Sequence, residues 1–276
     1  MTPDATSKRI IVNVGNSRTT WAVFSDNTLL KSWSNPTTQS RSQAPDIASD
    51  LDEGLDVDSI ENQIVYVCSV VPSASLSLIE ALHEHGFDPR EIRLDMQKGI
   101  TKLYPTFGTD RLANCYAAYK IYGSDCDNLL VLDFGTATTI SAVNSQGEFL
   151  GGMITLGFQD TLATIGKRLE QLPVIDYDGN GERVFDNVSP LSNSTRDSIF
   201  AGALYSQLGT IEIWTRKCKQ ELQGKTIVVA TGGLSRYIGQ HLEQGTIDAF
   251  DKELTLKGVN FIAQELEAEA VPADLS

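Results

Sequence analysis

The chain has 276 residues, of which 41% are hydrophobic, and it carries a formal net charge of −14 at pH 7. This length and apolar content can bury the core of one large domain or two modest ones. The negative charge argues against general affinity for nucleic acid or an anionic membrane, because both need a basic protein face. No run approaches the roughly 18 apolar residues of a membrane span, and the N-terminus lacks a secretory signal, so we expect a cytoplasmic protein.

The first half of the chain predicts an α/β lobe. Residues 9–24 have the pattern of a strand, a tight glycine turn and a second strand, which indicates a hairpin. A polar stretch follows, in which we expect a helix over residues 45–55 between loops. Residues 63–69 form the short apolar run of a buried strand, and residues 74–86 have apolar positions at helical spacing. A further helix follows the FGTD turn and ends near Gly123.

The second half starts the same pattern again. Residues 128–133 predict a strand, which leads through a glycine turn into a returning strand and then into a third strand over residues 148–154. The remaining elements are expected to be helices over residues 159–171 and 194–222, a buried strand over residues 226–230 and a last helix from about Lys257.

The two glycine turns are similar in sequence. Asn13-Val-Gly-Asn ends the first strand, Asp133-Phe-Gly-Thr ends the later one, and both lead through Thr-Thr into a strand that ends in Ala-Val. This similarity indicates an internal duplication. We therefore expect two related α/β lobes, residues 1–123 and residues 124–276.

These turns have the composition of phosphate-binding loops. A carboxylate at a strand end followed by a Gly-Thr turn can wrap a phosphate chain with N–H groups and hydroxyls, while the carboxylate holds a cation or its water shell. One such turn alone is equally a common hairpin, but two of them, one lobe apart, favour a site for Mg-ATP. The Thr231-Gly-Gly turn could lie against a ribose or adenine, or could simply connect a strand to a helix.

A candidate base precedes the helix that follows the FGTD turn. Gly108-Thr-Asp110-Arg111 places Asp110 near the positive end of the helix dipole and beside a permanent cation. An ionised aspartate can accept the proton of a substrate hydroxyl during phosphoryl transfer, and a guanidinium can hold an anionic group with a fork of hydrogen bonds. The same residues also fit an N-cap aspartate beside a surface arginine.

Taken in order, these pieces resemble the type III pantothenate kinases, which share a superfamily with actin, sugar kinases and a class of heat-shock chaperones. The resemblance spans residues 10–262. It is carried by VGNS at 14–17, CSVVP at 68–72, YPTFGTDR at 104–111, LDFGTATT at 132–139, GGMITLG at 151–157, LP at 172–173, Thr195, ATGG at 230–233 and LTLKG at 254–258. It implies an α/β protein with two ribonuclease H-like (actin-like ATPase) lobes and a nucleotide cleft between them.

The resemblance implies phosphorylation of pantothenate by ATP, which gives 4'-phosphopantothenate in the first step of coenzyme A biosynthesis. It implies ATP, Mg²⁺ and a monovalent cation, K⁺ or NH₄⁺, as cofactors, and a homodimer with the pantothenate pocket at its interface. Two alternatives remain. Another small-molecule kinase of the superfamily should lack the GTDR and Tyr-Pro pieces, and a non-catalytic relative with a regulatory role would bind nucleotide without turnover.

The resemblance also assigns roles to individual residues. ATP would be bound by Thr136 and by a first phosphate loop that consists of Asn13, Val14, Gly15, Asn16, Ser17, Arg18, Thr19 and Thr20. Asp133 would hold the monovalent cation, and Asp110 would be the catalytic proton acceptor. The pantothenate pocket would be lined by Tyr104, Gly108, Thr109, Asp110, Arg111 and Thr195.

Three positions depart from the family's usual pattern. Asn13 and Ser17 stand where the family usually has Asp and Thr, and Thr109 replaces a common Ala. The Asn13 amide can still form hydrogen bonds, but it brings no negative charge to a metal–phosphate cluster. In its GNSR-x-x-W and Tyr-Pro-Thr motifs, the chain resembles the cyanobacterial branch of the family, which also lacks the first Asp.

Overall fold

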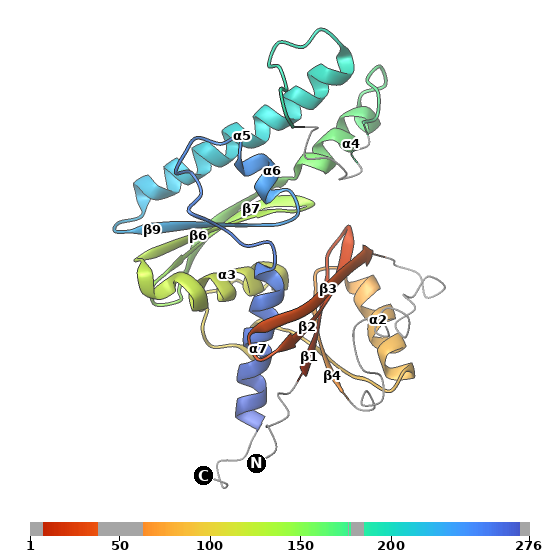
Figure 1. The fold of residues 1–276 in the computed structure, drawn as a ribbon, viewed down its shortest axis with the longest axis vertical. Helices are drawn as coiled ribbons and strands as arrows, with labels where there is room; N and C mark the ends of the chain where they lie inside the picture. The colour runs from red at the N-terminus through yellow and green to blue at the C-terminus, as the bar shows by residue number, and fades with distance from the viewer. Residues whose placement is uncertain (1–7, 38–62, 176, 178–184, 271–276) are drawn as a thin grey trace. The chain divides into compact units, whose positions relative to one another are not determined.

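The computed structural model describes residues 8–37, 63–175, 177 and 185–270. These residues group into two compact units, one drawn from 1–117 and 254–276 and the other from 118–253. Each unit contains a five-stranded sheet with helices packed on it (Figure 1). The predicted α/β class is therefore confirmed. The helix expected over residues 45–55 lies outside the described residues.

The first unit is built on a mixed sheet with the strand order β3-β2-β1-β4-β5. Its strands are β1 (Lys8–Val14), β2 (Arg18–Ser25), β3 (Thr28–Pro36), β4 (Ile64–Ser69) and β5 (Asp88–Glu91). Strand β1 is antiparallel to β2 and parallel to β4. Side chains alternate between the two faces of a strand, so Ile10, Val12 and Val14 share one face, where they join a core with helix α2 (Pro72–Glu84).

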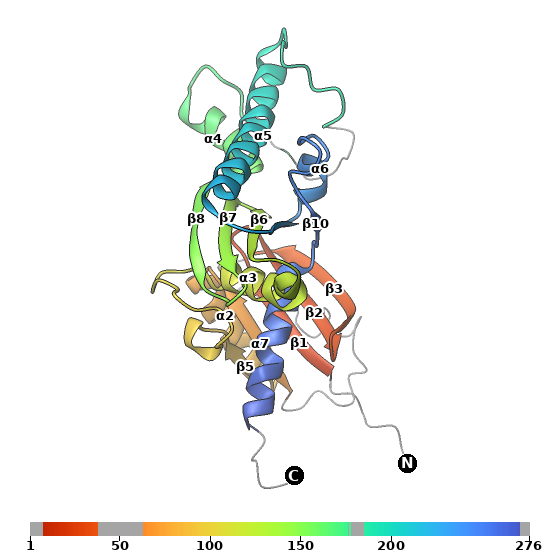
Figure 2. The ribbon, with the colours of Figure 1, turned by 90° about the vertical axis from the view of Figure 1, so that its left-hand side faces the viewer.

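Helix α7 (Leu254–Ala270) groups with the first unit, although the sequence assigned residues 124–276 to one lobe. It lies against β1 and β4 (Figures 1 and 2). Arg9 Nε on β1 donates to Glu267 Oε2 at 2.7 Å, and the Tyr66 hydroxyl on β4 donates to Glu267 Oε1 at 3.2 Å. These bonds connect the last helix to the first strand, a long-range link that no local pattern predicts.

The second unit repeats the topology of the first. Its sheet has the order β8-β7-β6-β9-β10, formed by β6 (Asn128–Phe134), β7 (Ala137–Asn144), β8 (Phe149–Leu156), β9 (Thr226–Thr231) and β10 (Ala249–Phe250). Strand β6 is antiparallel to β7 and parallel to β9, as β1 is to β2 and β4. The matching strand order and directions confirm the internal duplication.

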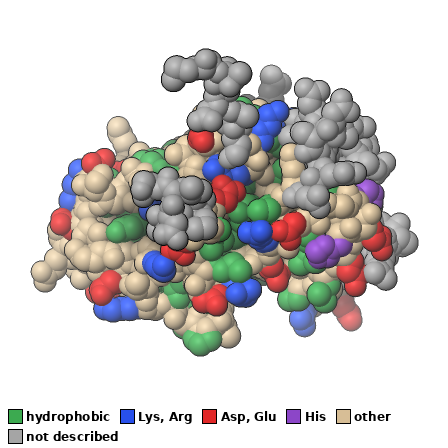
Figure 3. All heavy atoms as spheres, turned by 90° about the horizontal axis from the view of Figure 1, so that it is seen from below, with side chains coloured by type: hydrophobic (Ala, Val, Ile, Leu, Met, Phe, Trp, Pro, Cys, Tyr) green, Lys and Arg blue, Asp and Glu red, His purple; other side chains and the backbone are tan. Residues whose placement is uncertain are grey.

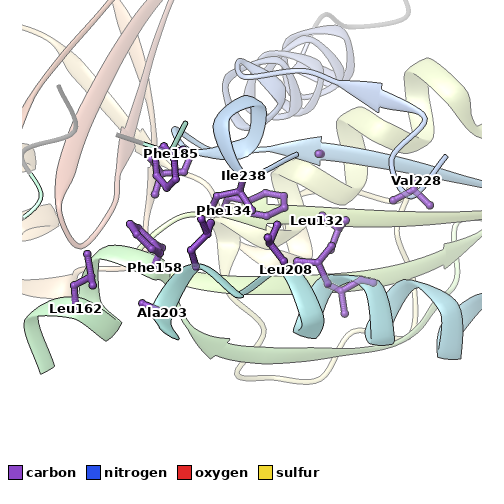
Figure 4. Close-up of a cluster of buried hydrophobic side chains, with 14 of the residues drawn as sticks. Leu132, Phe134, Phe158, Leu162, Phe185, Ala203, Leu208, Val228 and Ile238 are labelled. Carbon is purple, nitrogen blue, oxygen red and sulfur yellow. The ribbon is translucent and has the colours of Figure 1, made fainter. Parts of the chain in front are cut away.

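Helices α4 (Phe158–Arg168), α5 (Thr195–Glu221) and α6 (Ser235–Gly239) supply the other half of the second unit's core. Figure 4 shows how β6, α4, α5 and α6 contribute to one apolar cluster, with the buried side chains Leu132, Phe134, Phe158, Leu208 and Ile238. The alternate residues of β6 belong to this cluster because a strand presents every second side chain to one face. The core therefore holds β6 in place along its length up to its last residue, beside the second glycine turn.

Most predicted elements are confirmed with small shifts at their ends. Helix α7 begins at Leu254 rather than near Lys257. Three strands were not predicted: β3 is exposed or half-buried along its whole length, β5 has the sequence Asp-Pro-Arg-Glu, and β10 has two residues. None of the three has the apolar run or clean alternation that marks a strand in a sequence. Their place in a sheet is decided by pairing with a neighbouring strand.

The described surface carries charges of both signs. Figure 3 shows acidic, basic and hydrophobic side chains interspersed on the face that it presents. Within the described ranges, no helix is both long enough and apolar enough to cross a membrane.

Candidate functional site

The first glycine turn joins β1 to β2 and is tightly braced. The Gly15 N–H donates to the Arg18 carbonyl at 3.0 Å, and a Cβ at Gly15 would lie 3.2 Å from that oxygen. The Thr37 hydroxyl donates to the Gly15 carbonyl at 2.7 Å, and the Thr37 N–H donates to the Ser17 carbonyl at 3.1 Å. The same hydroxyl lies 3.1 Å from Thr19 Oγ1. Sequence reasoning missed Thr37 because it follows β3, which was not predicted.

The predicted phosphate-loop residues differ in how they are held. The Val14 side chain is buried in the core, and its carbonyl accepts from the Val70 N–H at 3.2 Å. Arg18 donates to Ser34 through Nε to Oγ at 2.8 Å and through Nη2 to the carbonyl at 2.6 Å, while the Thr20 hydroxyl donates to the same Oγ at 3.1 Å. Strand β3 therefore anchors Arg18 and Thr20 from the side.

Asn13 lies at the point where β1 enters this turn. It is in register with Thr20 on β2 and Cys68 on β4. Its Oδ1 atom is buried and has no hydrogen-bond partner among the described residues. A buried polar oxygen without a partner costs stability, so such an atom often marks a position for a water or an ion. Beyond it, Asn16 and Ser17 are exposed at the tip of the turn.

Asp110 lies in the first turn of helix α3 (Thr109–Tyr122). Its Oδ1 accepts the Arg111 N–H at 2.6 Å. Burial raises the pKa of Asp110 above its ordinary value, although the Arg111 N–H and guanidinium charge act in the opposite direction. A Cβ at Gly108 would lie 2.6 Å from the same Oδ1, so a side chain there would force this carboxylate to move. The structure therefore holds a half-buried carboxyl that a substrate hydroxyl can use as a base.

Thr109 attaches the start of α3 to the end of β4. Its hydroxyl donates to the Ser69 carbonyl at 2.8 Å. Burial raises the pKa of the neighbouring Cys68 thiol to about 12, with a further contribution from the Asp110 charge, so this thiol is neutral. Because Asn13 is in register with Cys68, the glycine turn and the start of α3 both border the end of β4.

Arg111 is held by two aromatic side chains and is only 7% exposed. Its Nη1 donates to the Tyr104 hydroxyl at 2.8 Å, and its guanidinium carbon lies 4.6 Å from the centre of the Phe107 ring. The Tyr104 and Phe107 rings meet edge to face at 5.2 Å. The predicted residues Tyr104, Gly108, Thr109, Asp110 and Arg111 thus gather at one place. Phe107 lies within the YPTFGTDR motif, but the sequence assigned it no role, because its contact with Arg111 is seen only in the fold.

The second glycine turn, in the second unit, lies at the equivalent place and is one residue shorter than the first. Asp133, the penultimate residue of β6, is in register with Thr139 and Thr231, the position that Asn13 occupies in the first sheet. The Gly135 N–H donates to the Ala137 carbonyl at 3.2 Å. The duplication therefore places an amide in one turn where the other has a carboxylate.

Two further glycines lie close to this second turn. Gly232 has a φ of +93°, and a Cβ there would lie 2.7 Å from Asp133 Oδ1. The Gly157 N–H donates to the Thr136 carbonyl at 2.8 Å, and a Cβ at Gly157 would overlap that oxygen. Close approach of three backbone segments is possible only because these positions lack side chains. The predicted Asp133 and Thr136 are therefore fixed by backbone contacts.

A cavity of about 370 Å³ lies next to Gly232. It is lined by Asp186, Gly232, Gly233, Ser235, Arg236, Tyr237, Gln240 and Lys252. The predicted Thr231-Gly-Gly turn forms part of its wall, and Arg236, Tyr237 and Lys252 add two cations and an aromatic ring. This lining suits an anionic ligand with a planar group. The sequence indicated the Thr231-Gly-Gly turn but not Asp186 and Lys252, which come from distant segments of the chain.

Two predictions concern a metal ion and Thr195. In the part of the chain that the structure describes, no group of three His, Cys, Asp or Glu side chains could hold a metal. A magnesium ion that is bound mainly through phosphate oxygens and waters needs only one or two carboxylates, and Asp133 can supply one. Thr195 is the exposed first residue of α5 in the second unit.

Comparison with known proteins gives a consistent result. Residues 9–217 match the family model described as type III pantothenate kinase. The chain is 31% identical to a type III pantothenate kinase of Agathobacter rectalis over 95% of this chain and 99% of that one, and 30% identical to one of Halalkalibacterium halodurans over 92% and 97%. Its fold is similar to a glucokinase from Balamuthia mandrillaris, with a TM-score of 0.53 and 14% identity over 96% and 95% of the two chains. The last likeness confirms the predicted sugar-kinase type of fold.

Proposed function

This chain belongs to the type III pantothenate kinase family and is an ATP-dependent pantothenate kinase of coenzyme A biosynthesis, and from this premise we propose how its residues perform the reaction. Pantothenate offers a primary hydroxyl as the nucleophile and a carboxylate as a handle. The start of α3 presents a half-buried carboxyl, Asp110, next to a buried guanidinium, Arg111. This pairing of a base and an anion-binding group is the observation that carries the proposal.

Asp110 acts as the general base in this proposal. Phosphoryl transfer needs positioning and charge neutralisation more than covalent help, so one group that accepts the hydroxyl proton is sufficient. Burial raises the pKa of Asp110 and so makes it a better proton acceptor than an exposed aspartate. Gly108 provides the space for the carboxylate, and the Thr109 hydroxyl anchors the turn on Ser69.

Arg111 binds the pantothenate carboxylate, with Tyr104 beside it. A guanidinium matches the geometry of a carboxylate and stays charged at all physiological pH values. The Tyr104 hydroxyl receives one Arg111 N–H at 2.8 Å, which supports this orientation. Thr195 also contacts pantothenate in this proposal, as a residue that the partner subunit contributes.

The two glycine turns bind phosphate oxygens of ATP. The first consists of residues 13–20, and the second includes Thr136. Their equivalent places in two sheets of the same topology support a shared role. The cavity next to Gly232 takes the adenosine part, with Tyr237 as a planar surface and Arg236 and Lys252 as cations near the phosphates.

The residues of the two turns fit the cations that the reaction uses. The Asn13 Oδ1, which has no hydrogen-bond partner in the described part of the chain, would be an acceptor for a water bound to magnesium. Asp133, at the equivalent place in the second sheet, holds a monovalent cation, K⁺ or NH₄⁺, through its carboxylate. Asn13 and Asp133 would orient these cations and their waters, and magnesium, when bound, would supply neutralisation of the charge on the phosphate oxygens.

The proposal includes a homodimer in the cytoplasm, with no nucleic-acid or membrane partner. Strand β8 at the sheet edge exposes Leu150, Ile154 and Leu156 by 44%, 59% and 45%. Alternation puts Ile154 and Leu156 on one face of the strand, whereas Leu150 lies at a register shift and lines a cavity with Met153 and with Cys218 of α5. An exposed apolar row of this kind supports a protein contact surface, and the net charge of −14 argues against anionic partners.

A coupled ADP-release assay with Mg-ATP and pantothenate tests the residue roles. We expect pantothenate-dependent turnover that requires K⁺ or NH₄⁺. Asp110→Asn should lower kcat by about 10²-fold or more, because proton transfer contributes a factor of that order. Asp95→Asn is the matched control, since the Asp95 side chain is 74% exposed and lies outside the site. Loss of turnover in both variants, or in neither, would remove Asp110 from its role.

One observation favours a second candidate function. Asn13 brings no charge to a position where its equivalent, Asp133, has a carboxylate. A nucleotide-binding protein that had lost turnover would bind ATP, release no ADP with pantothenate, and recover activity on Asn13→Asp. Turnover by the unmodified chain excludes this alternative.

A further inference from the structure

Phe107 is buried directly against the guanidinium of Arg111. The ring is 4% exposed, and the Arg111 guanidinium carbon lies 4.6 Å from its centre. The edge of Tyr104 contacts the Phe107 ring at 5.2 Å with an interplanar angle of 74°. The Phe107 N–H also donates to the Tyr104 carbonyl at 3.0 Å, so one turn of backbone presents both rings to the same arginine.

The two rings constrain Arg111 in complementary ways. An aromatic face attracts a cation through its quadrupole, and the attraction grows when the pair is shielded from water, as it is here. The Phe107 ring lies against one side of the guanidinium, and the Tyr104 hydroxyl accepts one of its N–H groups. The two rings together therefore limit the orientations that the Arg111 guanidinium can adopt.

We propose that Phe107 is a positioning residue that sets the plane of the Arg111 guanidinium and so determines how well the enzyme binds the substrate carboxylate. This inference rests on the proposed role of Arg111. An arginine side chain loses considerable rotamer freedom when it binds a ligand, and a side chain that is already held loses less. This gain in affinity applies to a carboxylate and not to a neutral group, because only the carboxylate accepts the two parallel charge-assisted hydrogen bonds of the guanidinium.

The test compares Phe107→Leu with Phe87→Leu. Phe87 is 7% exposed in the core of the same unit and lies outside the site, so the control removes an equally buried ring. For Phe107→Leu we expect KM for pantothenate to rise about tenfold, with kcat and KM for ATP within about twofold of the original enzyme. Phe107→Tyr keeps the aromatic face and should restore most of the affinity. Phe87→Leu should leave all three constants unchanged.

Two further measurements separate positioning from general damage. Discrimination between pantothenate and its neutral alcohol analogue should fall in Phe107→Leu by the same factor as KM rises. In an Arg111→Lys background, Phe107→Leu should have little additional effect, because the ring would act through the guanidinium. If Phe107→Leu does not fold, Phe107→Met replaces it as the variant without the aromatic ring, and Phe107→Tyr remains the variant that keeps the ring.

The outcomes distinguish this inference from the proposed function. An unchanged KM for pantothenate in folded Phe107→Leu, or equal losses in kcat and in both KM values, overturns the role of Phe107 and leaves the kinase roles intact. If the original protein binds pantothenate without turnover, the proposed catalysis fails, and the same comparison is made on Kd by calorimetry. If it does not bind pantothenate at all, both fail.

Discussion

At the scale of single residues, the site depends on polar atoms that the fold leaves in costly environments. Asp110 is a half-buried carboxyl whose pKa is raised by desolvation, and Asn13 presents a buried oxygen with no partner among the described residues. Such arrangements destabilise a fold slightly and are retained where a ligand or reaction uses them. Both residues therefore allow experiments that separate function from stability.

The first prediction concerns the pH dependence of turnover. Asp110 must be ionised to accept a proton, and burial raises its pKa above the ordinary value of 3.8. As pH falls through the raised pKa, the base becomes protonated, so kcat/KM should decline on the acid side at a higher pH than an exposed aspartate would give. A pH–rate profile checks this. An acid limb at the ordinary aspartate value would contradict it.

The same raised pKa predicts a stability effect. Between the unfolded and the folded pKa, the native state binds more protons than the unfolded state, so stability falls as pH rises through this window. Asp110→Asn removes the half-buried charge and keeps an oxygen for the Arg111 N–H. Its Tm at neutral pH should be a few degrees higher, and this gain should vanish below the unfolded pKa. Asp95→Asn, measured by calorimetry in parallel, should show no such pattern.

A substitution of Asn13 also allows an experiment that separates function from stability. Because its buried Oδ1 has no partner among the described residues, Asn13→Ala removes an unsatisfied atom whose burial costs about 1–3 kcal/mol. We expect an unfolding free energy that is unchanged or higher, together with at least about a tenfold loss of turnover. Chemical denaturation and the ADP-release assay give the two values. A large loss of stability would show that the amide serves the fold.

At the scale of elements, close approach of helices depends on missing side chains. Gly258 of α7 faces the backbone of α3 at Ala113, where any Cβ would overlap the carbonyl oxygen. Helix α7 also binds Asn114 of α3, whose Oδ1 accepts the Thr255 hydroxyl at 2.7 Å. Because α3 begins with the residues of the candidate site, this crossing supports the position of Asp110.

The substitution Gly258→Ala tests that crossing. The added methyl group should push α3 and α7 apart and cost about 1–3 kcal/mol or more, because the atom in the way is backbone and cannot rotate aside. Gly202→Ala in α5 is the matched control, since nothing lies within 4 Å of a Cβ there, and it should stabilise the helix by about 0.5–1 kcal/mol. Denaturant titrations of both variants measure the unfolding free energy, which should fall for Gly258→Ala and rise for Gly202→Ala. Equal effects would disprove the close crossing.

At the scale of the whole molecule, the same sheet topology occurs twice, with different residues at equivalent positions. Both sheets place a glycine turn at the end of the equivalent strand, β1 or β6. One turn begins with Asn13 and the other with Asp133, so equivalent positions of the two sheets differ in charge. In the second sheet, the edge strand β8 exposes the apolar side chains Ile154 and Leu156 on one face.

That face of β8 gives a prediction about assembly. Ile154→Lys places a charge in the centre of the β8 face, where the side chain is 59% exposed, and burying that charge in a dimer contact would be unfavourable. Analytical ultracentrifugation should show the proposed dimer for the original chain and a monomer for Ile154→Lys. Leu76→Lys, at a 65% exposed position of α2, should leave the dimer intact. A dimer that survives Ile154→Lys would place the contact elsewhere.

The sequence by itself determined much of the fold and of the motif positions. Apolar runs predicted β1, β4, β6 and β9 because a buried strand must be apolar, and helical periodicity predicted α2, α4 and α5. The repeated glycine turns indicated the duplication, because the same local geometry needs the same residue types. The order of motifs predicted the family that the comparisons confirm.

Only the tertiary structure decided which distant residues meet. It joined α7 to β1 through Glu267 and Arg9, gathered Arg236, Tyr237 and Lys252 around one cavity, and placed Phe107 under Arg111. These contacts depend on how strands pair and helices cross, and neither is encoded in local periodicity. The half-exposed β3 was missed for the same reason, since its place comes from pairing with β2. Local pattern specifies elements, whereas the shared burial of distant segments builds the site.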